Sequence, residues 1–225
     1  RKHIDPHLAQ LWLHSLACAL ATQLLAERLA PKLADQGFSC GMVHDCGKLA
    51  LLCALGQRYE KLLDAAPLSA LPLCALEAAE LGLDHAEAGK WLTQSWALPK
   101  LFVDAAWLHH QPEEVLADVD EHGGLMHLLA LGNILAHEVL AEPLDGPALA
   151  RRRFLLDRMD LSFHQVEKLK ETVGQRLAER RELFSLDEED AVAPCGGALL
   201  RAGRVLSQVI GGMVAGRGAA EASAS

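Results

Sequence analysis

The sequence is poor in the residues from which sheets and nucleic-acid surfaces are built. Aromatic residues make up only 4% of the 225 residues, and no segment shows the alternation of Val, Ile and Thr that is typical of strands. Lys and Arg number 21 against 30 Asp and Glu, which gives a formal net charge of −9. Because nucleic-acid backbones bind clustered basic side chains, we expect no nucleic-acid partner.

Long apolar runs and paired cysteines are also missing. The sequence has no uninterrupted apolar run of about 18 residues, the length that a membrane-spanning helix needs, and its N-terminus does not resemble a secretion signal. We therefore expect no membrane partner. The six cysteines form no CxxC pair and lie mostly within apolar runs, which predicts buried, reduced thiols. Together these absences favour a cytoplasmic location.

Alanine and leucine are abundant, and 51% of the residues are hydrophobic. Both residues have high helix propensity, so the composition predicts an all-α fold with a core large enough for one domain. We expect this domain to span residues 1–185, followed by a linker, an amphipathic helix at 198–214 and a disordered tail within 186–225. The apolar stripe of that last helix either packs back on the domain or binds a partner.

Capping signals locate several helices. A first helix is expected over residues 6–30, where Pro6 follows an acidic cap and Pro31 follows the helix. Two residue pairs match capping boxes, Asp84 with Glu87 and Ser162 with Gln165. The second box is expected to open a long helix that ends near residue 183. Other helices are expected at about 70–81, 99–109, 125–140 and 147–159.

Four separate helical segments carry histidines, one of them as a His-Asp pair. His and Asp are common ligands of Mn, Fe, Ni and Zn, and a helical bundle can bring such side chains together in its core. Eleven histidines also produce chance clusters, and a single histidine on a helix is more often packed or hydrogen-bonded than metal-bound. The candidates are His14, His44, Asp45, His85, His109 and His110. We assign His3, His7, His122, His127, His137 and His164 to ordinary surface or core positions.

The order of these motifs resembles a known family. Residues 11–17, Leu-Trp-Leu-His-Ser-Leu-Ala, and 41–48, Gly-Met-Val-His-Asp-Cys-Gly-Lys, resemble the HD superfamily of metal-dependent phosphohydrolases. The segments 80–89, 96–99 and 109–112 narrow the resemblance to the HDOD subgroup, the output domains of bacterial signalling proteins. The resemblance covers about residues 8–185 and implies an HD-superfamily-like helical bundle.

The resemblance also implies the roles of individual residues. His14, His44 and Asp45 match the ligands of a first metal ion, whereas His85, His109 and His110 match those of a second. Asn133 stands where the hydrolases carry a late Asp, and an amide is a weaker ligand without charge. Lys48 either contacts a phosphate group or is a solvated lysine at a helix start.

Three functions fit this pattern. The first is a bacterial signal-transduction output module that acts through protein interactions and binds a divalent metal at the HD-type site. Its expected partners are signalling domains, the family's N-terminal helices, which this sequence lacks, or a second copy in a homodimer. The second is a metal-dependent phosphohydrolase acting on a nucleotide or cyclic nucleotide. The third is an interaction scaffold whose site is vestigial. Cyclic-di-GMP hydrolysis of the HD-GYP kind is disfavoured because no Gly-Tyr-Pro occurs.

Overall fold

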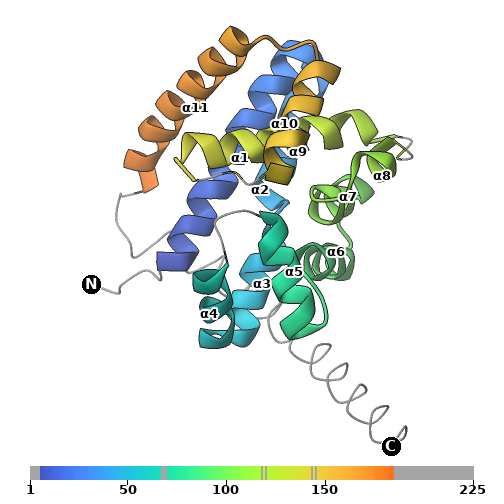
Figure 1. Cartoon of the computed structure of the whole chain (residues 1–225), viewed down its shortest axis with the longest axis vertical. Coiled ribbons are helices and arrows are strands. Elements are labelled where there is room, and N and C mark those ends of the chain that lie inside the picture. The colour runs from blue at the N-terminus through green and yellow to red at the C-terminus, as the bar shows by residue number, and fades with distance from the viewer. Residues whose placement is uncertain are drawn as a thin grey trace, which may run out of the picture.

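The computed structural model of the chain describes residues 6–66, 70–117, 119, 121–142, 144 and 146–184. These residues form helices and short connections, and no strand occurs among them (Figure 1). The all-α prediction is therefore confirmed for the part of the chain that is described. The predicted linker and the predicted helix at 198–214 lie outside the described residues.

Helix α1 (Pro6–Leu29) is the central helix of the main hydrophobic core. It packs against α2 (Ala34–Val43), α9 (Gly123–Val139) and α11 (Phe163–Phe184), which Figure 1 shows around it in the upper part of the molecule. The crossing of α1 and α9 requires a glycine, because a Cβ atom on Gly132 would lie 2.2 Å from the Thr22 hydroxyl oxygen. Because of this close approach, the next residue, Asn133, contacts α1.

A second hydrophobic cluster lies in the lower part of the molecule in Figure 1. It is formed mainly by α3 (Cys46–Leu55), α4 (Gln57–Ala65) and α6 (His85–Ser95), with α5 (Ala70–Leu81) also contributing. Gly47 permits the start of α3 to meet the start of α6, since a Cβ atom there would lie 1.9 Å from the His85 carbonyl oxygen. The His44-Asp45 pair therefore comes directly beside His85.

The remaining helices complete the bundle around these two clusters. They are η1 (Pro31–Leu33), α7 (Lys100–Leu108), α8 (Glu113–Ala117) and α10 (Gly146–Arg158). Both predicted capping boxes are confirmed. Asp84 caps α6 with Glu87 as its partner, and Ser162 and Gln165 exchange backbone-to-side-chain bonds of 2.8 and 3.4 Å at the start of α11.

Two segments, Pro6–Leu29 and Pro31–Leu55, are long and apolar enough to pass a length-and-composition test for membrane helices. The first is the core helix α1, and 61% of its most apolar window is buried inside the protein. The second is broken at His44-Asp45 between α2 and α3.

The prediction of buried, reduced thiols holds for Cys18 and Cys40, which are buried and free. It is wrong for Cys53, which is exposed.

Candidate metal centre

The six residues singled out from the sequence meet at one place. His14 lies in the middle of α1, His44 ends α2, and Asp45 is the N-cap of α3. His85 begins α6, and His109 and His110 directly follow α7. All are buried except His110, which is half-buried. Their ligand atoms form two sets, each within 4.8 Å, that share Asp45: His14 with His44, and His85 with His109 and His110.

Asp45 faces both sets with its two carboxylate oxygens. Oδ1 lies 3.5 Å from His85 Nε2 and 3.4 Å from His109 Nε2, whereas Oδ2 lies 3.5 Å from His44 Nε2 and 3.7 Å from His14 Nε2. These distances exceed those of ordinary N–H···O hydrogen bonds. We call this arrangement the HD-type centre, with an α6/α7 side (His85, His109, His110) and an α1 side (His14, His44).

Hydrogen bonds on the outer faces of three rings orient them. His44 Nδ1 lies 2.7 Å from the Gly41 carbonyl oxygen, and His109 Nδ1 lies 3.1 Å from that of Ala105. His85 Nδ1 lies 2.7 Å from a Glu77 carboxylate oxygen. Because a carbonyl or carboxylate only accepts, each Nδ1 carries the proton, and the metal-ligand position is Nε2.

Three atoms of the centre test whether these residues fit a metal ion. His44 Nε2, His109 Nε2 and Asp45 Oδ1 are buried, and within the described part of the chain none has a hydrogen-bond partner. Burying an unpaired polar atom is unfavourable. Asp45 Oδ1 and His109 Nε2, which belong to one set of close ligand atoms, therefore need a ligand in common, and His44 Nε2 needs one on the α1 side. Donor atoms bound to one ion at about 2.1 Å stand roughly 3.0–3.4 Å apart, close to the separations around Asp45. The residues therefore fit a divalent metal.

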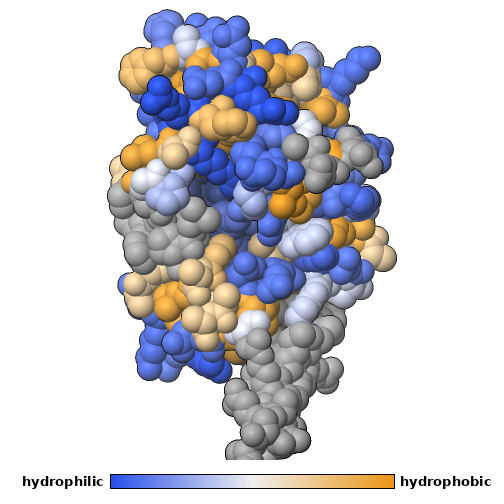
Figure 2. All heavy atoms as spheres, turned by 45° about the vertical axis from the view of Figure 1, so that its right-hand side comes forward, coloured by the Kyte–Doolittle hydropathy of each residue, from blue (hydrophilic) through white to orange (hydrophobic). Residues whose placement is uncertain are grey.

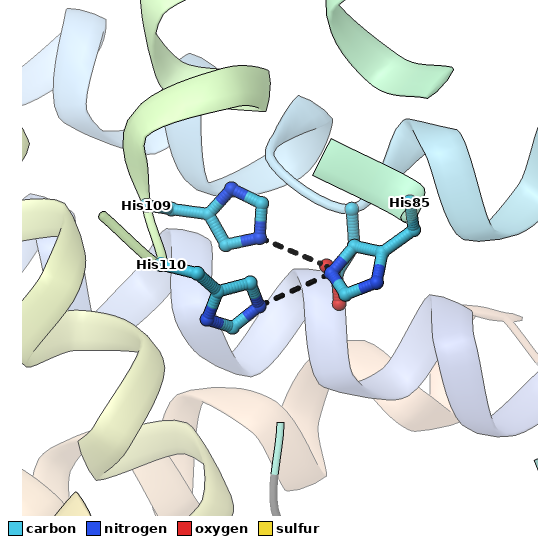
Figure 3. Close-up of side chains that lie close together, drawn as sticks. His85, His109 and His110 are labelled. Atoms are coloured by element: carbon cyan, nitrogen blue, oxygen red, sulfur yellow. Dashed lines mark hydrogen bonds and ion pairs between the residues drawn. The ribbon is translucent and has the colours of Figure 1, made fainter. Parts of the chain in front are cut away.

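His85 and His110 contact each other through their Nε2 atoms. Their Nε2 atoms lie 3.1 Å apart, a contact that Figure 3 marks with a dashed line between His110 and His85. Burial and Lys48 oppose protonation of His85, but the facing Cys74 and Glu77 outweigh them and raise its pKa to about 10. Burial and His109 hold the pKa of His110 well below its usual range. Without a metal, His85 thus donates Nε2–H to His110, and a bound ion would replace that proton.

Lys48 lies inside the centre and is only 6% exposed. Its Nζ donates to Asp45 Oδ2 at 2.8 Å. Burial alone would lower the pKa of Lys48, but the Asp45 carboxylate outweighs it and raises that pKa. The alternative of a solvated lysine is therefore wrong, because the turn between α2 and α3 carries this side chain inward onto the acid.

Asn133 of α9 lies beside His14, with its Oδ1 atom 2.8 Å from His14 Nε2. Burial and the neighbouring His137 lower the pKa of His14 well below its usual range, and burial lowers that of His44 to about 4. The α1 side thus consists of two neutral imidazole rings, the Asn133 amide and one oxygen of the Asp45 carboxylate.

Sequence reasoning missed several residues around the centre. Glu77, fully buried, accepts from the His85 backbone and from Tyr59 as well as from the His85 ring. In the sequence, Glu77 stands out only as an acidic residue within the apolar segment 70–81. No spacing pattern relates it to His85. His137, assigned to an ordinary position, packs on His14 with ring centroids 4.5 Å apart.

Comparisons with known proteins agree with this geometry. The family model of the HDOD domain matches residues 2–112. The crystal structure of the MmoQ response regulator from Methylococcus capsulatus str. Bath is similar at 29% identity, covering 74% of this chain and 62% of that chain, with a TM-score of 0.57. A fragment of MmoQ, residues 20–298, is similar at 31% identity over 68% of this chain and 57% of that chain, with a TM-score of 0.51. This chain thus spans less than two thirds of either.

A third similar structure supports the fold alone. It is a presumed phosphohydrolase from Shewanella amazonensis SB2B, 24% identical, covering 78% of this chain and 63% of that chain, with a TM-score of 0.57. No curated protein matches the sequence. Asn133 and all of α8 to α11 lie beyond the matched residues 2–112.

Proposed function

Because residues 2–112 belong to the HDOD domain family, we propose that the chain is a regulatory output module of bacterial signal transduction that binds a divalent metal at the HD-type centre. The observation that carries the metal proposal is the pair of buried, unpaired ligand atoms on Asp45 and His109, which belong to one set of close ligand atoms. The similarity to MmoQ, which is named a response regulator, supports the signalling role.

The donor set supports Mn, Fe, Ni or Zn as the ion. The α6/α7 side supplies three imidazoles and one carboxylate oxygen, a mixture that suits borderline divalent metals better than Ca or Mg. A bound ion would add positive charge beside Asp45 and tie α3, α6 and the end of α7 together. Metal occupancy would then stabilise the surface that those helices present. The proposed partners are other signalling domains or a second copy of this chain, in the cytoplasm.

A phosphohydrolase is the second candidate, and one observation favours it. Asp45 directs one oxygen at each side of the centre, as a carboxylate does when it bridges two metal ions that activate water. Two features oppose it. Lys48 is held on Asp45 rather than free for a phosphate, and Asn133 adds no charge to the α1 side.

The test is metal analysis of protein purified without a histidine tag. We expect at least one equivalent of a transition metal per chain, with one equivalent fewer in His109→Ala and no loss in His164→Ala, a control at an exposed histidine of α11. Absence of metal after reconstitution would overturn the metal proposal and leave an interaction scaffold with a vestigial site. Turnover of nucleotides or cyclic nucleotides that depends on Asp45 would overturn the regulatory-module proposal in favour of the phosphohydrolase.

A further inference from the structure

A histidine of α9 and a glutamate that follows this helix form a pair beside the HD-type centre. His137 lies one turn after Asn133 on the same face of α9, and its Nδ1 is hydrogen-bonded to Glu142 Oε2. Without a metal, the carboxylate keeps a proton on Nδ1, and an ion held by Nδ1 and Oε2 together would replace that proton.

The backbone after α9 brings the glutamate back to the ring. Ala141 adopts a positive φ of 58°, and the Glu142 amide donates to the His137 carbonyl oxygen at 2.9 Å. This turn reverses the chain so that the carboxylate lies beside the imidazole. Gln10, one turn before His14 on α1, donates to Glu142 Oε1 at 3.4 Å. The pair is therefore held against α1.

His14 completes a third group of ligands, which we call the outer triad (His14, His137, Glu142). Each of the three residues offers a ligand atom within 4.8 Å of the other two. The side chains of His137 and Glu142 are 11% and 13% exposed, whereas those of His44 and Asp45 are 0% and 2% exposed. His137 and Glu142 are thus closer to solvent than His44 and Asp45, and the outer triad shares His14 with the HD-type centre.

Charge distinguishes the outer triad from the inner ligands of the α1 side. Around His14, Asn133 contributes an uncharged amide, and the nearest carboxylate, Asp45, is already paired with Lys48 at 2.8 Å. The outer triad has a carboxylate of its own and two imidazoles, which is a ligand set found at zinc sites with an open coordination position. A divalent ion on this side would gain more charge compensation from Glu142 than from Asn133.

We infer that the outer triad is a further binding position for a divalent transition metal such as Zn, and that an ion on the α1 side is held by His137 and Glu142 rather than by His44. The inference extends the proposed metal centre but uses different residues. Its failure can therefore be separated from failure of the proposed function, which depends on His109.

The test measures zinc affinity by competition with a chromogenic chelator in the full chain carrying His109→Ala and His110→Ala, which removes two ligands of the α6/α7 side. We expect this protein to retain one equivalent of zinc. Adding either His137→Ala or Glu142→Gln should weaken that binding about tenfold or more. His127→Ala, at another buried histidine of α9, should leave it within about twofold.

Glu142→Gln changes one oxygen to an amide nitrogen, so it keeps the inference testable if His137→Ala unfolds the chain. Retained zinc that is lost in His44→Ala but not in His137→Ala or Glu142→Gln would overturn the inference, as would no zinc binding in the His109→Ala, His110→Ala protein. In either case, zinc binding by the parent that depends on His109 would leave the proposed function standing.

Discussion

The two sides of the HD-type centre differ in how many of their ligand side chains are oriented by hydrogen bonds. On the α6/α7 side, His85 and His109 are each held at Nδ1 by an acceptor, and the half-buried His110 contacts His85. On the α1 side only His44 is held in this way, by the Gly41 carbonyl oxygen, whereas His14 faces the amide of Asn133 and the ring of His137. Ligands whose orientation is fixed before binding lose less entropy when an ion arrives. We therefore expect the α6/α7 side to bind metal more tightly than the α1 side.

The largest effect should come from removing the carboxylate that both sides share. Asp45→Ala alone would leave Lys48 buried without its partner, at a cost of about 3–5 kcal/mol in unfolding free energy. We therefore pair Asp45→Asn with Lys48→Met, which removes both charges. This double variant should fold and lose metal from the α6/α7 side, measured by elemental analysis. Full retention of metal would show that Asp45 is not a ligand.

Glu77→Gln tests whether the α6/α7 side owes its strength to the oriented His85 ring. Loss of the carboxylate that anchors Nδ1 should weaken metal affinity about 10- to 100-fold, measured by chelator competition. Glu80→Gln, at an exposed position of the same helix, is the matched control and should change nothing. Equal effects of the two variants would show that orientation by Glu77 does not matter.

Asn133→Asp should reduce the difference between the two sides. A carboxylate in place of the amide adds a charged donor beside His14, so zinc affinity on the α1 side should rise about tenfold. The metal-free protein should become less stable, because a second acid is buried near Asp45. Asn133→Ala, which removes the contact with His14 without adding charge, is the control. A thermal melt with and without zinc measures both effects, and a zinc affinity no higher than that of the parent would contradict the prediction.

The smallest effect should come from α10, outside the ligand shell. Arg151 donates to the carbonyl oxygens of His109 and Gln111 at 3.1 and 2.8 Å, and to Glu113 at 3.0 Å. Arg151→Lys keeps the charge but loses the planar fork that makes these three bonds. Metal affinity on the α6/α7 side should fall by about two- to fivefold, the worth of roughly one hydrogen bond. Arg153→Lys, exposed on the same helix, should have no effect.

The surface of the protein indicates less about its function than the HD-type centre does. Figure 2 shows hydrophobic side chains scattered among hydrophilic ones on the face that it displays. Phe163, 74% exposed, and Leu149, 53% exposed, are the most exposed large apolar side chains in the described residues. Scattered apolar residues of this kind are ordinary on protein surfaces, so the proposed partners are argued from the family and not from a patch.

Much of the fold was predictable because its signals are local. Asp84 and Ser162 mark helix starts through bonds to residues three positions away, and Pro6 acts on the backbone at its own position as the first residue of α1. The candidate ligands were predictable through the family's motif order. Glu77, His137 and Arg151 were not, because their partners lie in other helices and no periodicity records which helices face each other.

The helical class, the helix boundaries and the residue types available as ligands follow from local sequence, since propensity and capping depend on neighbours along the chain. Contacts between distant helices set the rest: Asp45 faces both sets of histidines, Lys48 turns inward, and His137 and Glu142 lie against His14. Those outcomes depend on the packing of α1 against α9 and of α3 against α6. Helix packing is set by the shapes of whole surfaces in contact, which no short stretch of sequence contains.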